Sequence, residues 1–377
     1  MPLRSVQHDN VREHNRYAVL HALRELQSAT RAELARETAL SVPTVTTIVS
    51  ELGELGVVAE GDPAPSVGGR PARLHHLVAT ARNVLALDLS GEQLRAGRVD
   101  LLGEVTDVEG ARDLQLGPLA YQRLEEWVLA AIEREEAAGF TVSALAVAVP
   151  GVVDQASGHV RLAPALGWSD EPVAQKLRAV TGLPVLLEND VNAVALGELL
   201  RGAAMGRRNV LYLALGSGVG SALVIDGVLY RGANGAAGEI GYSLLPGLSE
   251  AGLDLGASGP FERHLLGIAA SFLVGGVLDL TTAERRAAFE ALAEKLRLAL
   301  HNLACVLDPE LIVVAWSADP DGVLARALGE RWVAPLPVSI VAGSLGARAA
   351  LYGAGHLALG RLTAGICGLG TDEWSNP

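Results

Sequence analysis

The chain has 377 residues, of which 50% are hydrophobic and 19% charged, and its formal net charge is −13. This length allows two or three domains with buried cores, and every apolar run is interrupted before membrane-spanning length by a glycine, a proline or a charge. The two cysteines, Cys305 and Cys367, lie 62 positions apart, which argues against a disulfide framework or a cysteine-based zinc site. Residues 1–20 lack the apolar centre of a signal peptide, so we expect a cytoplasmic protein with no membrane partner.

The acidic charge is distributed unevenly along the chain. Residues 1–80 hold 8 basic and 9 acidic residues, a net charge of −1, whereas residues 81–377 hold 22 basic and 34 acidic residues, a net charge of −12. The excess of acid therefore belongs to the larger part. A nucleic-acid-binding role for the first 80 residues is not excluded by the overall charge.

Residues 11–55 predict three helices. Apolar residues recur at helical spacing in residues 11–26, and Thr30 with Glu33 three positions later forms a capping box that begins a second, short helix. Ser41 caps a third helix, in which Pro43 occupies the first turn. The third helix has one apolar stripe and an opposite face rich in hydroxyl groups. The stripe consists of Val42, Val45, Ile48, Val49, Leu52 and Leu55.

Two short helices, a tight turn and a third helix with a polar outer face describe a helix-turn-helix. Two strands, "VVAEG" and "RLHHLV", follow and are joined by "DPAPSVGGRPA", which predicts a wing. A small helical dimerisation module is the alternative, and the order of the helices, the turn length and the wing favour DNA binding. The candidate DNA contacts are Ser41, Thr44, Thr46 and Thr47 of the third helix and Gly69 and Arg70 of the wing.

Arg70 is the candidate for minor-groove insertion. It follows two glycines and precedes Pro71, so its backbone is slim and held extended. The same stretch is equally consistent with a flexible linker.

The remainder of the chain contains a repeat. Residues 83–105, "NVLALDLSGEQLRAGRVDLLGEV", and residues 209–231, "NVLYLALGSGVGSALVIDGVLYR", match in pattern when shifted by 126 positions. Each predicts an antiparallel three-stranded meander with a Gly/Ser turn after its first strand. Two such meanders, each followed by alternating strands and helices, predict two similar α/β lobes with a cleft between them. The two turns would face each other across this cleft, where backbone amides bind phosphates.

Four stretches of the chain resemble the ROK family of bacterial sugar kinases and transcriptional repressors. They are "VAVPGVVDQASGHVRLAPALGW", "LPVLLENDVNAVALGELLRG", "LGSGVGSALVIDGVLYRGANGAAGEIGY" and, in the third helix, "TVTTIVSELGELG". The resemblance extends from about residue 10 to about residue 360. It implies an α/β fold in which an N-terminal winged helix-turn-helix (residues 1–80) precedes two lobes (81–200 and 201–377) of the actin-like, ribonuclease-H-like sugar-kinase type.

The resemblance also implies a sugar site between the lobes. By their places in the family motifs, Asp190 corresponds to the kinase base and Asn189 to a sugar ligand. Glu239 corresponds to a second carboxylate ligand, with a helix-capping or structural role as the alternative. Carboxylates and amides suit this task because each ring hydroxyl both donates and accepts. The complete expected sugar-binding set is Gly151, Asn189, Asp190, Glu239, Tyr242 and Glu262.

The chain departs from the kinase pattern where a phosphoryl donor would bind. The phosphate turn reads "DLSGEQ" (88–93), in which Glu92 opposes a phosphate, and the nucleotide turn reads "VAWSADP" (314–320), in which Trp316 replaces glycine. Tyr242 replaces the histidine of the family's zinc site, and its cysteines are missing. We therefore expect no metal, no cofactor and no catalytic residue, with Asp190 as the base if any kinase activity remained.

These features predict a DNA-binding repressor of carbohydrate genes whose affinity for operator DNA changes when a sugar binds in a degenerate kinase cleft. The family forms homodimers, so a homodimer or a dimer of dimers is expected. Two alternatives remain: a regulator controlled by a protein partner instead of a sugar, and an active ATP-dependent sugar kinase.

Overall fold

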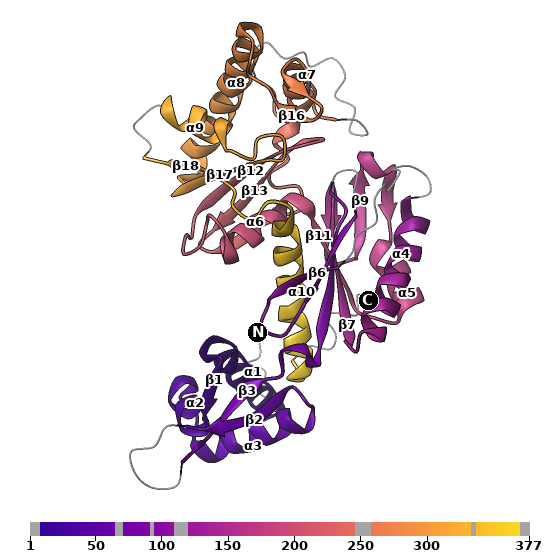
Figure 1. The fold of residues 1–377 in the computed structure, drawn as a ribbon, viewed down its shortest axis with the longest axis vertical. Coiled ribbons are helices and arrows are strands. Elements are labelled where there is room, and N and C mark those ends of the chain that lie inside the picture. Colours follow the sequence, from indigo (N-terminus) through magenta and orange to yellow (C-terminus); the bar gives the residue numbers. More distant parts are fainter. Residues whose placement is uncertain are drawn as a thin grey trace, which may run out of the picture.

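The structure, a computed structural model, describes residues 8–64, 71–90, 94–108, 120–245, 258–332 and 337–369. Three regions follow one another in space (Figure 1): the helices α1–α3, a first five-stranded sheet, and a second five-stranded sheet. Helix α10 (Ala349–Ile366), the last element, runs between the two sheets and back towards α1.

The N-terminal region contains α1 (His8–Leu26), α2 (Arg31–Thr38) and α3 (Val42–Glu54) beside a sheet of order β1-β3-β2. Its strands are β1 (Ser28–Thr30), β2 (Val58–Pro63) and β3 (Arg73–Leu77), all antiparallel. The predicted helix starts are confirmed. Thr30 and Glu33 form the reciprocal capping box, and the Ser41 Oγ accepts a hydrogen bond from the Thr44 N–H at 3.3 Å. The chain therefore begins with a winged helix-turn-helix.

The apolar stripe of α3 is shorter than the sequence predicts. Val45, Ile48, Val49 and Leu52 are buried among the other helices, but Val42 and Leu55 are 48% and 46% exposed. These two residues lie at the ends of α3, and the buried core of the three helices covers only the middle of it. Val42 therefore belongs to the outer surface at the start of α3.

The first sheet has the order β11-β7-β4-β5-β6, and the second has the order β14-β13-β12-β17-β18. In each, a three-stranded antiparallel meander is extended by two parallel strands on the side of its first strand. The predicted duplication of lobes is confirmed. The strands of the first sheet are β4 (Asn83–Asp88), β5 (Arg95–Val99), β6 (Val105–Val108), β7 (Val142–Val149) and β11 (Val185–Asn189). Those of the second are β12 (Val210–Leu215), β13 (Val219–Ile225), β14 (Val228–Tyr230), β17 (Leu311–Trp316) and β18 (Ser339–Ala342).

Helices and small hairpins complete the two lobes. The helices are α4 (Ala120–Ala137), α5 (Val173–Thr181), α7 (Pro260–Ala269), α8 (Ala283–Leu307) and α9 (Val323–Glu330). The short strands are β8 (Val152–Asp154), β9 (His159–Ala163), β10 (Trp168–Glu171), β15 (Leu273–Val274) and β16 (Val277–Leu278). None of the helices within the described ranges is long and apolar enough to cross a membrane.

Helices α6 (Asp190–Arg201) and α10 cross between the two lobes at the distance of backbone contact. A Cβ atom on Gly353 of α10 would lie 1.8 Å from the Ala193 carbonyl oxygen, and one on Gly197 of α6 would lie 2.1 Å from the Ala349 carbonyl oxygen. Only glycine allows this approach. Although α10 belongs to residues 201–377, its contacts join it to β4 and β7 of the first sheet.

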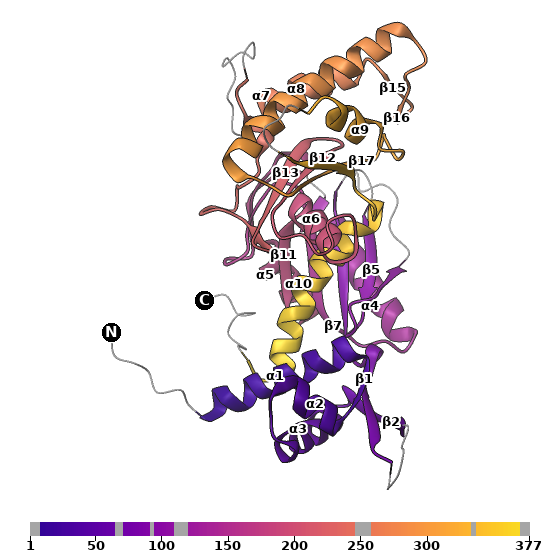
Figure 2. The same cartoon turned by 90° about the vertical axis from the view of Figure 1, so that its left-hand side faces the viewer.

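Helix α10 also extends the core of the first lobe to the DNA-binding region. One hydrophobic cluster includes Leu23 of α1, Val84 of β4, and Ala354, Leu359 and Cys367 at the C-terminal end of the chain. Figure 2 shows α10 with α6 near its start and α1 near its end. The Arg24 Nε of α1 adds a hydrogen bond of 2.8 Å to the Leu101 carbonyl, between β5 and β6.

The α6–α10 crossing gives a direct prediction. Gly353→Ala lowers the free energy of unfolding by about 1–3 kcal/mol, because the added methyl group overlaps the backbone of α6. Gly360→Ala, in the same helix with nothing within 4 Å, raises it by about 0.5–1 kcal/mol through helix propensity alone. Thermal and denaturant unfolding measure both variants. A Gly353→Ala protein as stable as Gly360→Ala would contradict the close crossing.

Candidate functional site

The turn from β11 into α6 carries Asn189 and Asp190. Asn189 is the N-cap of α6, and its Oδ1 accepts a hydrogen bond from the Asn192 N–H at 2.9 Å. Its Nδ2 donates to the Gly151 carbonyl at 2.8 Å. Gly151 has a φ of 99°, and a Cβ there would lie 2.0 Å from the Leu162 carbonyl oxygen. The structure thus brings Gly151 and Asn189, two of the expected sugar-binding residues, into direct contact and uses both ends of the Asn189 amide for the fold.

Asp190 lies where carboxyl groups from both lobes converge. Its Oδ1 accepts a hydrogen bond from the Val191 N–H at 2.9 Å. Burial, then the nearby carboxyl groups of Asp88 and Glu239, raise the pKa of Asp190 to about 7. Asp88 ends β4 in the first lobe, whereas Glu239 follows the meander of the second. With a pKa near 7, the Asp190 carboxyl group is able to remove a proton from a hydroxyl group. It is equally able to accept a hydrogen bond from that hydroxyl group without removing its proton.

Glu239 and Glu262 form the second-lobe side of this carboxyl cluster. Burial, followed by repulsion from Glu262, raises the pKa of Glu239. Its position depends on Gly238, which has a φ of 92° and leaves room for the Ser221 carbonyl oxygen only because it lacks a Cβ. Glu262, in the first turn of α7, accepts a hydrogen bond from the Val219 N–H at 2.9 Å. Tyr242 ends the short helical turn that begins just after Glu239 and is half-buried.

Glu188, two positions before Asp190, links the two lobes and is not among the residues that the sequence predicts for the site. Its buried carboxylate accepts five hydrogen bonds: from the Asn189 N–H, the Asn192 Nδ2, the Gln155 Nε2 and, from the second lobe, the Arg231 Nε and Nη2. The shortest, to the Arg231 Nη2, is 2.6 Å. An acid closing the apolar run "VLLE" was the available signal, because a buried carboxylate requires partners.

A second buried carboxylate, Glu198, holds the other end of α6. It accepts hydrogen bonds from the Ala203, Ser344 and Leu345 N–H groups at 2.7, 2.8 and 2.9 Å. Residues 344 and 345 connect β18 of the second sheet to the start of α10. Both ends of α6 are therefore linked to the second lobe through a carboxylate.

The two turns that the sequence analysis compared with the phosphate and nucleotide turns of the kinases are partly described. Glu92 lies outside the described residues, and the Ser90 N–H donates to the Asp88 Oδ1 at 2.9 Å. Trp316 is 8% exposed at the end of β17, where its ring meets the edge of Phe272 at 6.0 Å between centroids. Trp168 is buried in the core of the first lobe. Within the described ranges, no group of three or more histidine, cysteine or acidic side chains is placed to hold a metal ion.

The candidate DNA contacts of α3 lie on its N-terminal half. The Ser41 and Thr44 hydroxyl groups lie 2.7 Å apart, and Thr46 and Thr47 donate to the carbonyls of Val42 and Pro43 at 2.9 and 3.2 Å. With their hydrogens donated within the helix, Thr46 and Thr47 offer methyl groups and acceptor lone pairs to a partner.

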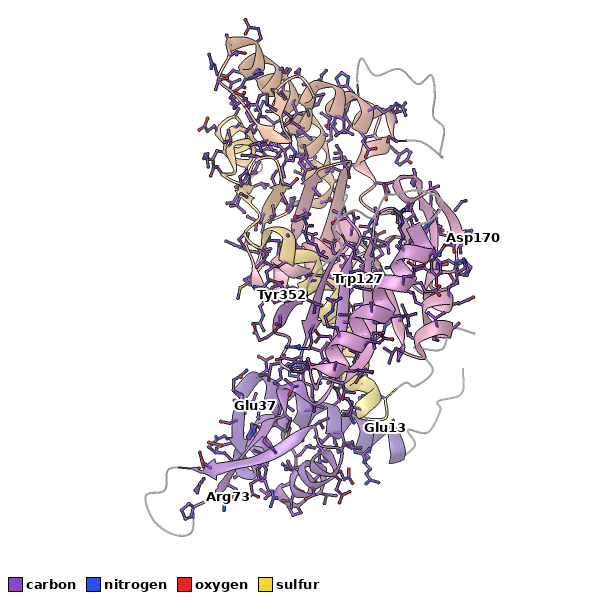
Figure 3. The ribbon with its side chains drawn as sticks, turned by 45° about the vertical axis from the view of Figure 1, so that its right-hand side comes forward. Glu13, Glu37, Arg73, Trp127, Asp170 and Tyr352 are labelled. Carbon is purple, nitrogen blue, oxygen red and sulfur yellow. The ribbon has the colours of Figure 1, made fainter. Side chains whose placement is uncertain are left out.

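The wing is described only at its base. Gly69 and Arg70 lie outside the described residues. Arg73, at the start of β3, is exposed at the base of the wing and lies 3.3 Å from Glu60 (Figure 3). It is a basic group of the wing that the sequence analysis did not single out.

Two family models match the chain. One, described as the ROK family, matches residues 84–262, and one described as winged helix-turn-helix DNA-binding matches residues 12–59. The chain is 27% identical over 350 residues to a xylose repressor of Caldicellulosiruptor bescii, with 84% of this chain and 86% of that protein covered. It is 28% identical over 313 residues to a glucokinase of Streptomyces coelicolor, with 73% of this chain and 96% of that protein covered.

Solved structures show the same fold. A ROK family transcriptional regulator described as a homolog of the E. coli MLC protein covers 97% of this chain, with 99% of its own chain covered, a TM-score of 0.76 and 20% identity. A ROK family glucokinase from Streptomyces griseus, in complex with glucose and AMPPNP, covers 73% of this chain, with 98% of its own chain covered, a TM-score of 0.60 and 25% identity.

The Asp190 environment predicts a pH dependence of stability. The carboxyl group has an ordinary pKa of 3.8 in the unfolded chain and about 7 in the folded one, so between these pH values the folded chain keeps a proton that the unfolded chain releases. The free energy of unfolding therefore falls as the pH rises from 4 to 7, by at most ~4 kcal/mol for this group. Asp190→Asn removes this decrease and stabilises the protein more at pH 8 than at pH 5.

Unfolding midpoints at the two pH values test this prediction. Asp226→Asn, which changes an exposed carboxyl group on the same chain, is the matched control and shifts both midpoints little. A shift caused by Asp190→Asn that is equal at pH 5 and pH 8 would contradict the raised pKa.

The inter-lobe ion pair gives another prediction. Arg231→Gln leaves the Glu188 charge buried without its cation and lowers the free energy of unfolding by about 3 kcal/mol. Arg208→Gln breaks an exposed pair with Asp226, also in the second lobe, and changes it by less than about 0.5 kcal/mol. Denaturant unfolding compares the two variants. Equal small effects would show that the Glu188–Arg231 pair does not hold the lobes together.

Proposed function

Because the chain belongs to the ROK family and begins with a winged helix-turn-helix, we propose that it is a sugar-responsive, DNA-binding transcriptional repressor of carbohydrate genes. It acts in the cytoplasm, and its partners are operator DNA and a small sugar effector. The observation that carries this proposal is one hydrophobic core shared by α1, α10 and the first sheet. Strand β4 of that sheet ends at Asp88, whose carboxyl group lies near Asp190, so the core connects the winged helix-turn-helix to the proposed effector site.

The proposed effector site is the carboxyl cluster between the lobes. Asp190 and Glu239 bind sugar hydroxyl groups, since both come from the cleft and neither accepts a hydrogen bond from a cation in the described structure. Glu262, Tyr242, Asn189 and Gly151 complete the site. Asn189 contributes mainly by fixing the turn, because Asn192 and Gly151 already engage its amide. The name of the C. bescii relative makes xylose the first sugar to test.

We propose further that the chain is not a kinase. Trp316 occupies the end of β17 with a buried ring, whereas the family's nucleotide turn needs glycine at this place. The acidic Glu92, in the turn that corresponds to the phosphate turn of the kinases, opposes a transferable phosphate. Asp190 then accepts a hydrogen bond from a sugar hydroxyl group, and no phosphoryl group is bound for that hydroxyl group to attack.

We propose the expected domain boundaries: residues 1–80 for the winged helix-turn-helix, 81–200 for the first lobe and 201–377 for the second, with α10 returning to the first lobe.

A homodimer, or a dimer of dimers, presents two α3 helices to a pseudo-palindromic operator. Sugar binding alters how the lobes close, and α10 passes this change to α1.

A thermal-shift screen of the purified chain against xylose, other monosaccharides, amino sugars, sugar phosphates and ATP tests the proposal. We expect one free sugar to raise the unfolding midpoint of the wild type and not that of Asp190→Ala, because loss of the acceptor carboxylate costs at least ~2 kcal/mol of binding. ATP has no effect, and a coupled assay with ATP and the same sugar detects no phosphorylation.

Stabilisation by ATP, or turnover in the coupled assay, would overturn the repressor proposal in favour of a kinase. A chain that binds DNA but responds to none of the sugars would support control by a protein partner instead.

A further inference from the structure

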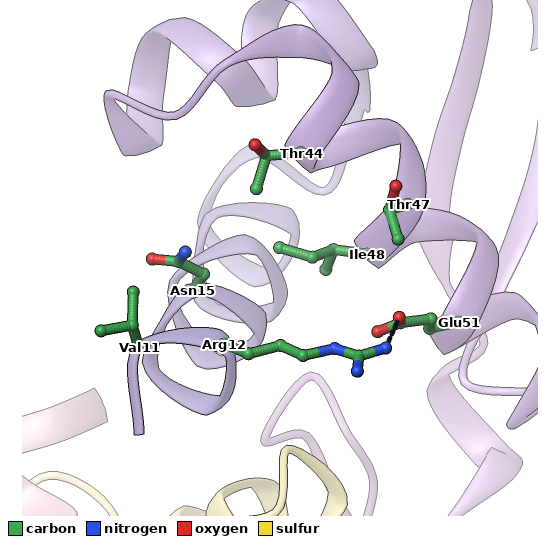
Figure 4. Close-up of a pocket in the computed structure, with 7 residues that line it drawn as sticks. All are labelled: Val11, Arg12, Asn15, Thr44, Thr47, Ile48 and Glu51. Atoms are coloured by element: carbon green, nitrogen blue, oxygen red, sulfur yellow. Dashed lines mark hydrogen bonds and ion pairs between the residues drawn. The ribbon is translucent and has the colours of Figure 1, made fainter. Parts of the chain in front are cut away.

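A groove of about 330 Å³ lies between α1 and α3 on the outer side of the winged helix-turn-helix (Figure 4). Helix α3 contributes Thr44, Thr47, Ile48 and Glu51, and α1 contributes Val11, Arg12 and Asn15. Two of these residues, Thr44 and Thr47, are proposed DNA contacts. The groove therefore extends the DNA-facing surface of α3 onto the N-terminal half of α1.

Duplex DNA requires cations on that surface, and α3 supplies none. Residues 42–54 contain no lysine or arginine and carry two acids, Glu51 and Glu54. Phosphate contacts supply most of the sequence-independent affinity of DNA-binding proteins. Two cations of α1, Arg12 and Arg16, form ion pairs with Glu51 of α3, and Arg12 also lines the groove.

The two arginines differ in what surrounds them. The Arg16 side chain is 22% exposed and its Nε lies 2.7 Å from the Glu51 Oε2. The Arg12 side chain is 61% exposed, and its guanidinium meets the other oxygen of the same carboxylate, as the dashed line in Figure 4 marks. Glu51 itself is 17% exposed. If Arg12 leaves, Glu51 keeps Arg16 as its partner, so the Arg12 guanidinium can change partners without leaving a buried charge unpaired.

We propose that Arg12 is a phosphate-binding residue of the DNA interface, held by Glu51 in the DNA-free protein and transferred to a backbone phosphate when duplex DNA binds. Asn15 and Thr47 line the same groove and are placed to contact the phosphate beside it. This inference rests on the proposed DNA-binding function and adds a contact outside the recognition helix and the wing.

The exchange gives Glu51 a function of its own. Its carboxylate competes with DNA for Arg12 and sets a negative charge near the phosphates, so it lowers affinity for every duplex. Affinity then depends more on the base contacts of α3. Removing the charge of Glu51 is expected to strengthen binding to DNA of any sequence.

The experiment measures fluorescence anisotropy of a labelled random-sequence duplex of about 25 base pairs with the full chain, at four or more salt concentrations. Arg12→Gln is expected to weaken binding about fivefold and to reduce the slope of log affinity against log salt by about 1, since one phosphate contact is lost. Glu51→Gln is expected to strengthen binding by a similar factor. Arg12→Lys retains most of the affinity, because the charge remains.

Arg331→Gln is the matched control, because Arg331 is 68% exposed and pairs with the exposed Glu290. Glu290 lies in α8 and Arg331 directly follows α9, and Figure 1 shows both helices at the opposite end of the structure from α1–α3. Its binding and salt slope should equal those of the wild type. The opposite signs for Arg12→Gln and Glu51→Gln cannot both come from misfolding, and unfolding midpoints confirm that each variant is folded.

An Arg12→Gln protein with the affinity and salt slope of Arg331→Gln would overturn the inference and leave the proposed function standing. So would a Glu51→Gln protein that binds more weakly than the wild type. If the wild type binds no duplex even at the lowest salt concentration, the proposed function fails, and this inference fails with it.

Discussion

The backbone contact between α6 and α10 is the constraint on which the rest of the structure depends. Helix α6 begins at Asp190, beside carboxyl groups from both lobes, and α10 ends beside α1 of the winged helix-turn-helix. Gly197 and Gly353 allow the two helices to meet without intervening side chains. Packed interfaces of this kind change between discrete arrangements more readily than they deform. We therefore propose that a movement of α6 on effector binding is transmitted to α10.

Carboxylates organise both sides of this crossing, but they do so in two different ways. Glu188 and Glu198 are buried acceptors that bind cations or backbone N–H groups from the second lobe, and they fix where α6 lies. Within the described residues, Asp190 and Glu239 have no cation as a hydrogen-bond partner, and burial, followed by repulsion from Asp88 for Asp190 and from Glu262 for Glu239, raises their pKa values. Groups that are held uncompensated at a cleft gain most from a ligand rich in hydroxyl donors. The fold thus separates the carboxylates that hold the lobes together from those that we propose bind an effector.

The sequence predicted the features that depend on local or repeated patterns. The capping box at Thr30, the cap at Ser41 and the two meanders follow from residue types at short spacing, and each is confirmed. It did not predict the return of α10 to the first lobe, the Glu188–Arg231 pair or the Arg12–Glu51 pair. These contacts join residues 35 or more positions apart, and no local period encodes them. Val42 was assigned to the core because helical spacing does not show where neighbouring helices end.

The central claim is that occupancy of the cleft changes affinity for DNA. The measurement that tests it most directly is the affinity of the chain for an operator duplex, selected from a random pool by the protein itself, with and without the sugar that stabilises it. The account predicts a change of about 5- to 150-fold in the wild type, the usual range for coupled sites, and none in Asp190→Ala. A sugar that binds the wild type and leaves its affinity for DNA unchanged would contradict the account.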